Sequence, residues 1–319
     1  MQTQRQKHIV VIGSYNVGFI CSTPRLPVWG ETILGSGFSV CDGGKGSNQA
    51  VAASKLGGNV SFIGCVGNDA YGKSGVEMLR QAGVNVDDVS VSPTAATGVG
   101  FVFLNERGEN CIVVDPGANH LLLPEDLETK ESLQNADILV FQLENHIETI
   151  RKGMELGKKS GKTIIFNPAP ASPGLDDLIG LSSIVTPNES ELLILNGLDP
   201  SSTPSTEDCE RLARILLRKG PEAVIVTRGE KGALLVTADD SVIVPAPRVN
   251  VVDTTGAGDS FTGGLAVALS DGSSLPDAVR FACYVGAFCV TKEDVIPALP
   301  NREEFHSFLL QCAGPNSVF

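Results

Sequence analysis

The chain has 319 residues, of which 42% are hydrophobic and 19% are charged, and its formal net charge is −13. This composition is that of a globular protein long enough for one large α/β domain or a domain with an appendage. An acidic surface repels nucleic acid and anionic lipid on average, so any phosphate has to be held locally by backbone amides and a few cations. We therefore expect neither a nucleic acid nor a membrane as a partner.

The N-terminal segment and the cysteines indicate the compartment. The first eight residues are polar and contain no apolar core, so no secretory signal is evident. No apolar run reaches the roughly 18–20 residues that cross a bilayer. The eight cysteines are scattered without Cys-x-x-Cys spacing, which favours free thiols over a disulfide framework or a zinc site. We expect a cytoplasmic protein.

Short apolar runs alternate with amphipathic segments along most of the chain. The runs with the length of buried strands are 8–12, 60–66, 137–142, 163–166, 183–186 and 223–227. The segments with apolar residues at helical spacing are 47–56, 72–82, 147–158, 189–196 and 207–219. This alternation predicts βαβ units and a doubly wound, mostly parallel α/β sheet flanked by helices.

Two segments interrupt this alternation with β-structure that has no intervening helix, residues 14–42 and 97–116. In the second, strands at 98–104 and 110–114 flank a turn at 105–108, which is typical of a hairpin. We expect the two segments to form a small β-sheet lid over a core made of residues 1–13, 43–96 and 117–319. A lid would exclude water from a reaction. A decorative or oligomerising extension is an equally open interpretation, and the two are compatible.

The most informative motif is the stretch Asp-Thr-Thr-Gly-Ala-Gly-Asp-Ser at 253–260, which an apolar helical run follows at once. Gly256, Ala257 and Gly258 expose backbone N–H groups at a helix N-terminus, where the helix dipole favours an anion. Asp259 in the first turn would repel a phosphate, so it is a poor phosphate ligand. It is a good base for a hydroxyl that attacks that phosphate. The alternative interpretation is a capping aspartate in a glycine turn.

Polar residues follow several of the predicted strands. A second glycine-rich turn, 43–48, also leads into a helix, but it lacks the Lys-Ser/Thr ending of a Walker A loop. Because the carboxyl ends of parallel strands meet at one rim of a sheet, we expect the polar groups there to converge. The residues at these strand ends are Asn16, Glu144, Asn167, Asn188, Glu191 and Thr227.

These pieces resemble, in their order, the ribokinase family of ATP-dependent sugar kinases. The resemblance spans about residues 8–310, and no Gly-x-Gly-x-x-Gly follows the first strand as it would in a dinucleotide-binding dehydrogenase. The matching stretches are 13–16 (GSYN), 27–32 (PVWGET), 43–50 (GGKGSNQA), 142–144 (QLE), 167–170 (NPAP), 187–191 (PNESE), 227–229 (TRG) and 254–260 (TTGAGDS).

The resemblance implies a role for each matching residue. It makes Asp259 the catalytic base, and the amides of Gly256, Ala257 and Gly258 the anion hole for the transferred phosphoryl group. It assigns to the sugar Asn16, Val17, Gly18, Gly44, Lys45, Gly46, Ser47, Asn48, Glu144 and Asp259. It assigns to the nucleotide Asn188, Thr227, Arg228, Gly229, Glu230, Lys231, Gly232, Gly258, Asp259 and Cys283. It implies Mg²⁺ held through water near Asn188 and Glu191, and a monovalent cation, K⁺, near Asp253, Thr255, Val290, Glu293 and Val295.

The sequence departs from the family pattern at two places. The family usually carries Asn-x-Asp at the first strand end, and that aspartate holds two sugar hydroxyls; here the motif ends in Gly18. Each hydrogen bond lost from a charged group costs about 1.5–3 kcal/mol unless another group, such as Tyr15 or Asp42, reaches in. In the cation loop, Ala298 stands where the family has a serine, which predicts a weakened potassium site.

We therefore expect an ATP-dependent kinase that phosphorylates the primary hydroxyl of a pentose, D-ribose at O5. The alternative substrates are 2-deoxyribose, another sugar or a nucleoside, because Gly18 replaces the aspartate. A non-catalytic sugar or nucleotide sensor is a further alternative. The resemblance also implies a homodimer that forms through the lid.

Overall fold

The computed structural model describes residues 5–107 and 110–313. Its centre is an eight-stranded sheet with the order β14-β13-β12-β11-β10-β9-β1-β4, in which β13 and β14 are antiparallel and the other strands are parallel. The strands are β1 (His8–Ile12), β4 (Asn59–Ile63), β9 (Ile138–Phe141), β10 (Thr163–Phe166), β11 (Ile184–Val185), β12 (Ala223–Thr227), β13 (Ala233–Thr237) and β14 (Ser241–Val244). The predicted doubly wound, mostly parallel sheet is confirmed.

Helices cover both faces of this sheet, so its strands are buried on both sides. Along β1, Ile9 and Val11 point into one apolar cluster, while Val10 and Ile12 point into the other. The first cluster packs under α1 (Lys45–Lys55), α2 (Ala70–Gln81), α8 (Ala257–Ser270), α9 (Leu275–Cys289) and α10 (Arg302–Ala313). The second packs under α3 (Glu131–Asn135), α4 (Ile147–Lys159), α5 (Asp176–Leu181), α6 (Glu189–Leu195) and α7 (Thr206–Leu217).

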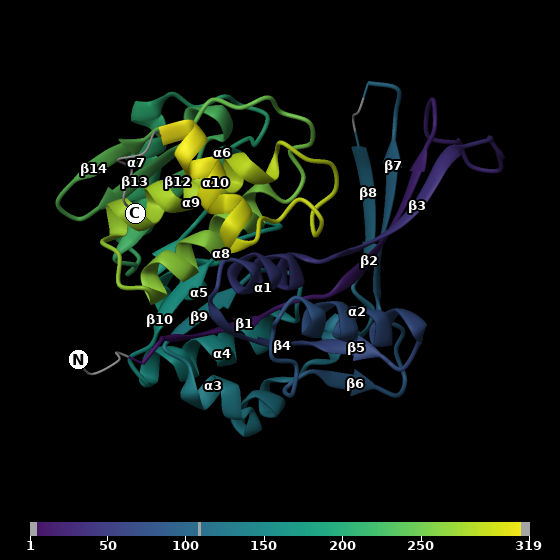
Figure 1. The fold of residues 1–319 in the computed structure, drawn as a ribbon, viewed down its shortest axis with the longest axis horizontal. Coiled ribbons are helices and arrows are strands. Elements are labelled where there is room, and N and C mark those ends of the chain that lie inside the picture. Colours follow the sequence, from purple (N-terminus) through teal and green to yellow (C-terminus); the bar gives the residue numbers. More distant parts are fainter. Residues whose placement is uncertain (1–4, 108–109, 314–319) are drawn as a thin grey trace.

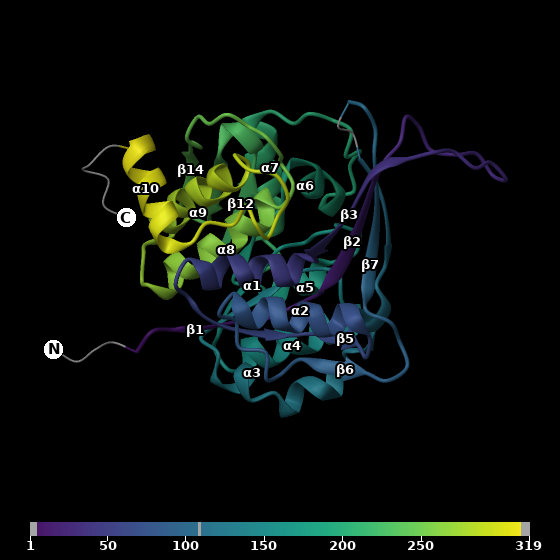
Figure 2. The ribbon, with the colours of Figure 1, turned by 45° about the vertical axis from the view of Figure 1, so that its right-hand side comes forward.

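A smaller four-stranded sheet stands away from the core, at the right-hand side in Figure 1 and again in Figure 2. Its order is β3-β2-β7-β8, with β2 (Asn16–Ser22), β3 (Ser36–Gly43), β7 (Gly98–Leu104) and β8 (Asn110–Asp115). The β2–β7 pair is parallel, and the hairpin expected between 98 and 114 is the antiparallel β7–β8 pair. Gly108 of its predicted turn lies outside the described residues. We call this sheet the lid.

Several short elements were not predicted from the sequence. The predicted run 60–66 divides into β4 and β5 (Cys65–Gly67), and β5 pairs in parallel with the unpredicted β6 (Ser90–Ser92). In the described part of the chain, three 3₁₀ helices span Gly117–Leu121, Pro124–Thr129 and Gly229–Lys231. Within residues 5–107 and 110–313, no helix is long and apolar enough to cross a membrane.

Candidate active site

The predicted anion site lies at the start of α8. Gly256 caps the helix with φ of 75°, a left-handed conformation that glycine adopts without strain. A Cβ on Gly256 would lie 2.4 Å from a methyl carbon of Val295, so the space also requires glycine. Gly256, Ala257, Gly258 and Asp259 line a cavity of about 150 Å³. N–H groups in a first helical turn have no partner within the helix, so this cavity suits an anion.

Asp259 lies in the first turn of α8 and is almost completely buried, with 7% of its surface exposed. Asn48 Nδ2 donates to its Oδ2 at 2.9 Å, and Gln49 Nε2 donates to its Oδ1 at 2.9 Å. Burial raises the pKa of Asp259, while the charge of Lys45 and the two amide donors lower it; the net direction is upward. The carboxylate is therefore a stronger base than an ordinary aspartate, and the two amides hold it in one orientation.

Glu144 gathers the polar groups expected at the ends of β1 and β9. Its Oε2 accepts hydrogen bonds from the Ser14 hydroxyl, from the backbone N–H of Lys45 at 2.9 Å and, at the longer distance of 3.5 Å, from Asn16 Nδ2. Asn119, which the sequence analysis did not single out, donates from its Nδ2 to Asn16 Oδ1 at 2.8 Å. The structure thus brings Asn16 and Glu144 together, as the sequence predicts.

Lys45 joins this polar rim to Asp259. It lines the small cavity together with Asn188, Glu191 and Asp259. Burial alone would lower the pKa of Lys45, but the charges of Asp259, Glu144 and Glu191 outweigh burial and raise it. The Lys45 amine therefore stays protonated beside the two acidic side chains that line the cavity, Glu191 and Asp259, where it can donate to a phosphate or hydroxyl oxygen.

Some residues predicted to bind the sugar have structural roles instead. The side chain of Val17 is buried in the core because it points to the face of β2 opposite to Asn16. Ser47 donates to the backbone oxygens of Gly43 and Gly44, at the start of α1. The strand alternation that turns Asn16 toward the site turns Val17 away from it.

The lid strand at Gly18 contains no replacement for the missing aspartate. Gly18 pairs with Cys41 across β2 and β3, and a Cβ on Gly18 would lie 2.6 Å from the Cys41 sulfur. Of the two groups that could compensate, Tyr15 is buried and its hydroxyl donates to Asp42 Oδ1, while Asp42 itself is only half-buried. Burial raises the pKa of the Cys41 thiol to about 11, so it stays neutral.

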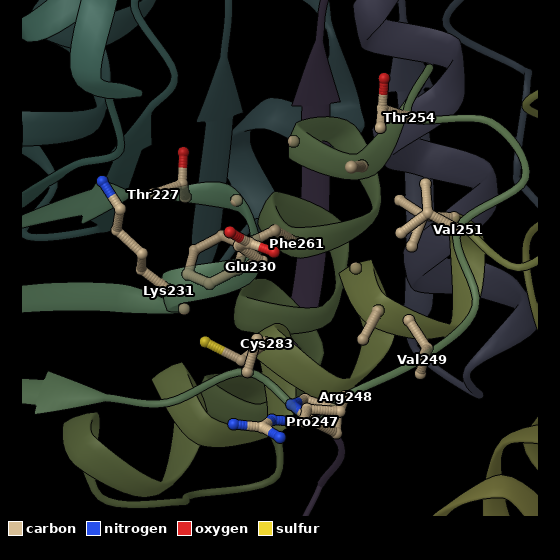
Figure 3. A pocket seen from close by; sticks show the side chains of 18 residues that line it. Thr227, Glu230, Lys231, Pro247, Arg248, Val249, Val251, Thr254, Phe261 and Cys283 are labelled. Carbon is tan, nitrogen blue, oxygen red and sulfur yellow. The ribbon is translucent and has the colours of Figure 1, made fainter. Parts of the chain in front are cut away.

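A larger cavity of about 680 Å³ adjoins the anion site. Figure 3 shows Thr227 and Lys231 on one side of it and Val249 and Val251 on the other, with Phe261 and Cys283 contributed by α8 and α9. The predicted residues Thr227, Gly229, Glu230, Lys231, Gly232, Gly258 and Cys283 all line it. The sequence analysis missed its apolar wall, which consists of Pro247, Val249, Val251, Phe261, Ala287 and Val290.

The two cavities share the residues Thr227, Thr254, Ala257 and Gly258. A flat apolar group in the larger cavity can therefore extend a charged chain toward the helix N-terminus. Arg228 of the predicted nucleotide set does not line the larger cavity, and its guanidinium pairs with Glu189 Oε1 at 2.8 Å and with Thr206 Oγ1. This side chain fastens α6 and α7 to the end of β12.

Asn188 and Glu191 form a reciprocal cap at the start of α6. Asn188 Oδ1 accepts from the Glu191 N–H, and Glu191 Oε2 accepts from the Asn188 N–H, each at 2.8 Å. Burial raises the pKa of Glu191, against the opposing effects of the Asn188 hydrogen bond and of Lys45. The buried Thr186 hydroxyl lines the small cavity together with Asn188 and Glu191, and it has no hydrogen-bond partner among the described residues. This set of oxygens fits a hydrated Mg²⁺.

In the predicted monovalent-cation loop, several of the oxygens that would bind the cation already accept hydrogen bonds. Asp253 Oδ1 accepts from the Thr255 N–H and hydroxyl, and its Oδ2 accepts from the Asp294 N–H at 3.3 Å. The Val290 carbonyl already accepts the N–H groups of residues 252 and 253, so it does not fit the role of a ligand. Glu293 is exposed.

Comparison with known proteins agrees with this geometry. The pattern described as "pfkB family carbohydrate kinase" matches residues 6–302. A ribokinase of Haemophilus influenzae is 35% identical, covering 95% of this chain and 99% of its own, and a deoxyribokinase of Salmonella typhi is 40% identical, covering 94% and 98%.

The solved structures show the same likeness in three dimensions. The structure of Arabidopsis thaliana ribokinase complexed with ribose and ATP is 32% identical, has a TM-score of 0.86, and covers 95% of this chain and 98% of its own. The buried Asp259 and the two adjoining cavities are thus found on the fold of a known sugar kinase. The chain belongs to the pfkB family of carbohydrate kinases and is an ATP-dependent sugar kinase.

Proposed function

We propose that this kinase phosphorylates the primary hydroxyl of a pentose, with Asp259 as the base. The observation that carries the proposal is the buried Asp259 carboxylate in the same small cavity as the first-turn amides of α8. The sugar oxygen attacks the γ-phosphorus and its proton passes to Asp259. The bond between the γ-phosphorus and the bridging oxygen breaks, and ADP leaves.

Gly256, Ala257 and Gly258 stabilise the charge of the transferring group. Their N–H groups are held by the backbone before the reaction begins, so no reorganisation is needed. Removing one such preorganised donor typically costs about 10²–10³-fold in rate. Lys45, which remains protonated, adds a positive charge on the same side of the cavity.

ATP would occupy the larger cavity with its adenine between the apolar wall and the 229–232 turn. The residues shared by the two cavities lead its phosphates toward α8. Mg²⁺ would be held through water by Asn188 and Glu191, with the free Thr186 hydroxyl as a further partner. The ion would neutralise charge on the phosphates. Potassium activation stays a prediction, and the engaged Val290 carbonyl counts against it.

The substrate that we propose first is D-ribose, phosphorylated at O5. Relatives named as ribokinases, and the solved complex with ribose and ATP, support this choice. A second candidate is 2-deoxyribose. The neutral Cys41 thiol beside Gly18 favours this sugar. Neither residue carries a charge that could bind the secondary hydroxyl that 2-deoxyribose lacks. The deoxyribokinase among the relatives supports that candidate.

A panel of pentoses with ATP and Mg²⁺, followed by ADP release, tests this proposal. We expect D-ribose or 2-deoxyribose to exceed hexoses and nucleosides in kcat/KM, and the phosphate to be found on O5 by NMR. Asp259→Asn should lower kcat by at least about 10²-fold, since general base catalysis is typically worth about 10²–10⁴-fold. A variant as fast as the wild type would remove Asp259 from the role of base.

We further propose a homodimer through the lid and a cytoplasmic location. The lid carries exposed apolar side chains on the face that bears Phe19, namely Phe38, Val40, Phe101 and Val113. A contiguous apolar patch of this kind is typical of a protein interface. All eight cysteines of the sequence are free, which supports a reducing compartment.

A further inference from the structure

Gln49 is a fully buried glutamine on α1 that contacts the proposed base directly. Its Nε2 donates to Asp259 Oδ1 at 2.9 Å and to Asn167 Oδ1 at 3.1 Å. Its Oε1 accepts from Gln142 Nε2 at 2.6 Å. None of the surface of Gln49 is exposed, so its side chain does not contact the sugar or the nucleotide. Asp259 lies on α8, Asn167 follows β10, and Gln142 follows β9.

The orientation of the Gln49 amide is fixed by its neighbours. Asn167 Nδ2 donates to the Thr186 carbonyl at 2.9 Å, so Asn167 Oδ1 must face Gln49 as an acceptor. Gln142 donates to Gln49 from the other side. The NH₂ group of Gln49 has two hydrogens, and each has one acceptor, Asn167 or Asp259. Gln49 can therefore act toward Asp259 only as a donor.

The two oxygens of Asp259 then have different surroundings. Oδ1 is bonded to Gln49, which is completely buried. Oδ2 is bonded to Asn48, whose own Oδ1 is buried and has no hydrogen-bond partner among the described residues. An unpaired buried amide oxygen beside the rim that carries Asn16 and Glu144 indicates that a ligand hydroxyl completes this site.

We propose that Gln49 is a positioning residue for the base: it fixes Oδ1 of Asp259 and leaves Oδ2, beside Asn48, to take the proton of the sugar. The inference rests on the proposed function and deepens it. The Gln49 N–H stabilises the ionised carboxylate, so Gln49 also helps to keep Asp259 ready to accept a proton. The other titratable groups that act on Asp259 are Lys45 on α1, Glu144 after β9, Glu191 on α6 and Cys289 on α9.

The test is Gln49→Met, which keeps the length of the side chain and removes its donor. We expect kcat/KM for the pentose to fall by about 10- to 100-fold, the usual effect of a hydrogen bond to a charged group. The acid limb of the pH profile of kcat/KM should move to higher pH, because the carboxylate loses a stabilising donor. The KM for ATP should stay unchanged.

The control is Thr149→Val, which removes one hydrogen bond from a fully buried residue to Leu122 on the far face of the sheet. It should leave the pH profile in place. If Gln49→Met does not fold, Gln142→Met removes only the donor to Gln49 Oε1, and the acid limb should move in the same direction by less. An active variant whose acid limb coincides with that of the wild type would overturn the inference. A wild-type protein that phosphorylates no pentose would instead overturn the proposed function.

Discussion

At the scale of single residues, the site depends on which side chain each position presents to the cavity. Asp259 was predicted from its place after the glycines of 256–258, and the structure places it at the expected helix start. The donors that orient it, Asn48 and Gln49, are adjacent in the sequence, yet only Asn48 resembles a ligand-binding residue in the sequence pattern. Local sequence thus identifies Asp259 as the candidate base, and packing identifies the amides that hold it.

The pair of Gly18 and Cys41 gives a prediction on sugar choice. Gly18→Asp alone should fit poorly, because its Cβ would meet the Cys41 sulfur at 2.6 Å. Gly18→Asp combined with Cys41→Ala removes that contact and adds a carboxylate on the face of Asn16. We expect this double variant to raise kcat/KM for ribose relative to 2-deoxyribose by about 10-fold or more, which corresponds to one hydrogen bond to a charged group.

Steady-state kinetics on both sugars measures this ratio. Cys41→Ala alone is the matched control, because it opens the same space without adding a charge. The explanation fails if the double variant folds, remains active and keeps the ratio of the wild type.

At the scale of elements, the close contact of α1 with the end of β1 places Lys45, Asn48 and Gln49 at the site. Gly46 makes this approach possible, since a Cβ there would lie 2.5 Å from the Ser14 nitrogen and 2.6 Å from the Gly13 Cα. Gly44 and Gly46 of the 43–48 turn are therefore required for packing, whether or not a ligand approaches them. The turn that lets α1 contact the end of β1 is therefore also the turn proposed to lie beside the ligand.

Gly46→Ala should lower the free energy of unfolding by about 1–3 kcal/mol or more, because the added methyl group overpacks the backbone of the β1 end. Urea unfolding, followed by circular dichroism, measures this change. Gly100→Ala is the matched control, because nothing lies within 4 Å of its Cβ position. Equal stabilities for the two variants would contradict the packing argument.

At the scale of the whole molecule, the lid is a sheet that stands away from the core and exposes apolar side chains. Phe19 stacks with Phe101 and Phe38, with ring centroids 5.7 Å and 6.4 Å apart, yet Phe38, Phe101 and Val113 remain largely open to solvent. A sheet of this size with few contacts to the core gains stability when a second apolar surface covers it. In the dimer that we propose, a second copy of the chain would provide this surface.

Phe101→Lys together with Val113→Lys should convert the dimer into a monomer, because two charges would be buried at its interface. Sedimentation velocity at several protein concentrations measures the change. Ile243→Lys on β14 is the control for an exposed apolar residue outside the lid, and it should leave the mass unchanged. A wild-type chain that sediments as a monomer throughout would dismiss the lid dimer.

The sequence by itself determined the βαβ order, the segments of the small β-sheet and the glycine-rich start of α8 with Asp259 in its first turn. These features follow from short-range causes, namely apolar periodicity, glycine conformations and capping, and neighbouring residues report them directly. The hairpin β13–β14 was not predicted, because the turn that joins its two strands has no distinctive hairpin signature in the sequence.

Only the tertiary structure decided which distant groups meet. Gln49 and Asp259 are 210 positions apart, and Gly18 and Cys41 are neighbours only because β2 pairs with β3 in one register. Arg228 lies in the predicted nucleotide turn, but its side chain is drawn into an ion pair with Glu189. Hydrogen-bond partners and cavity walls depend on the packing of elements that are far apart in the chain, and no local pattern records that packing.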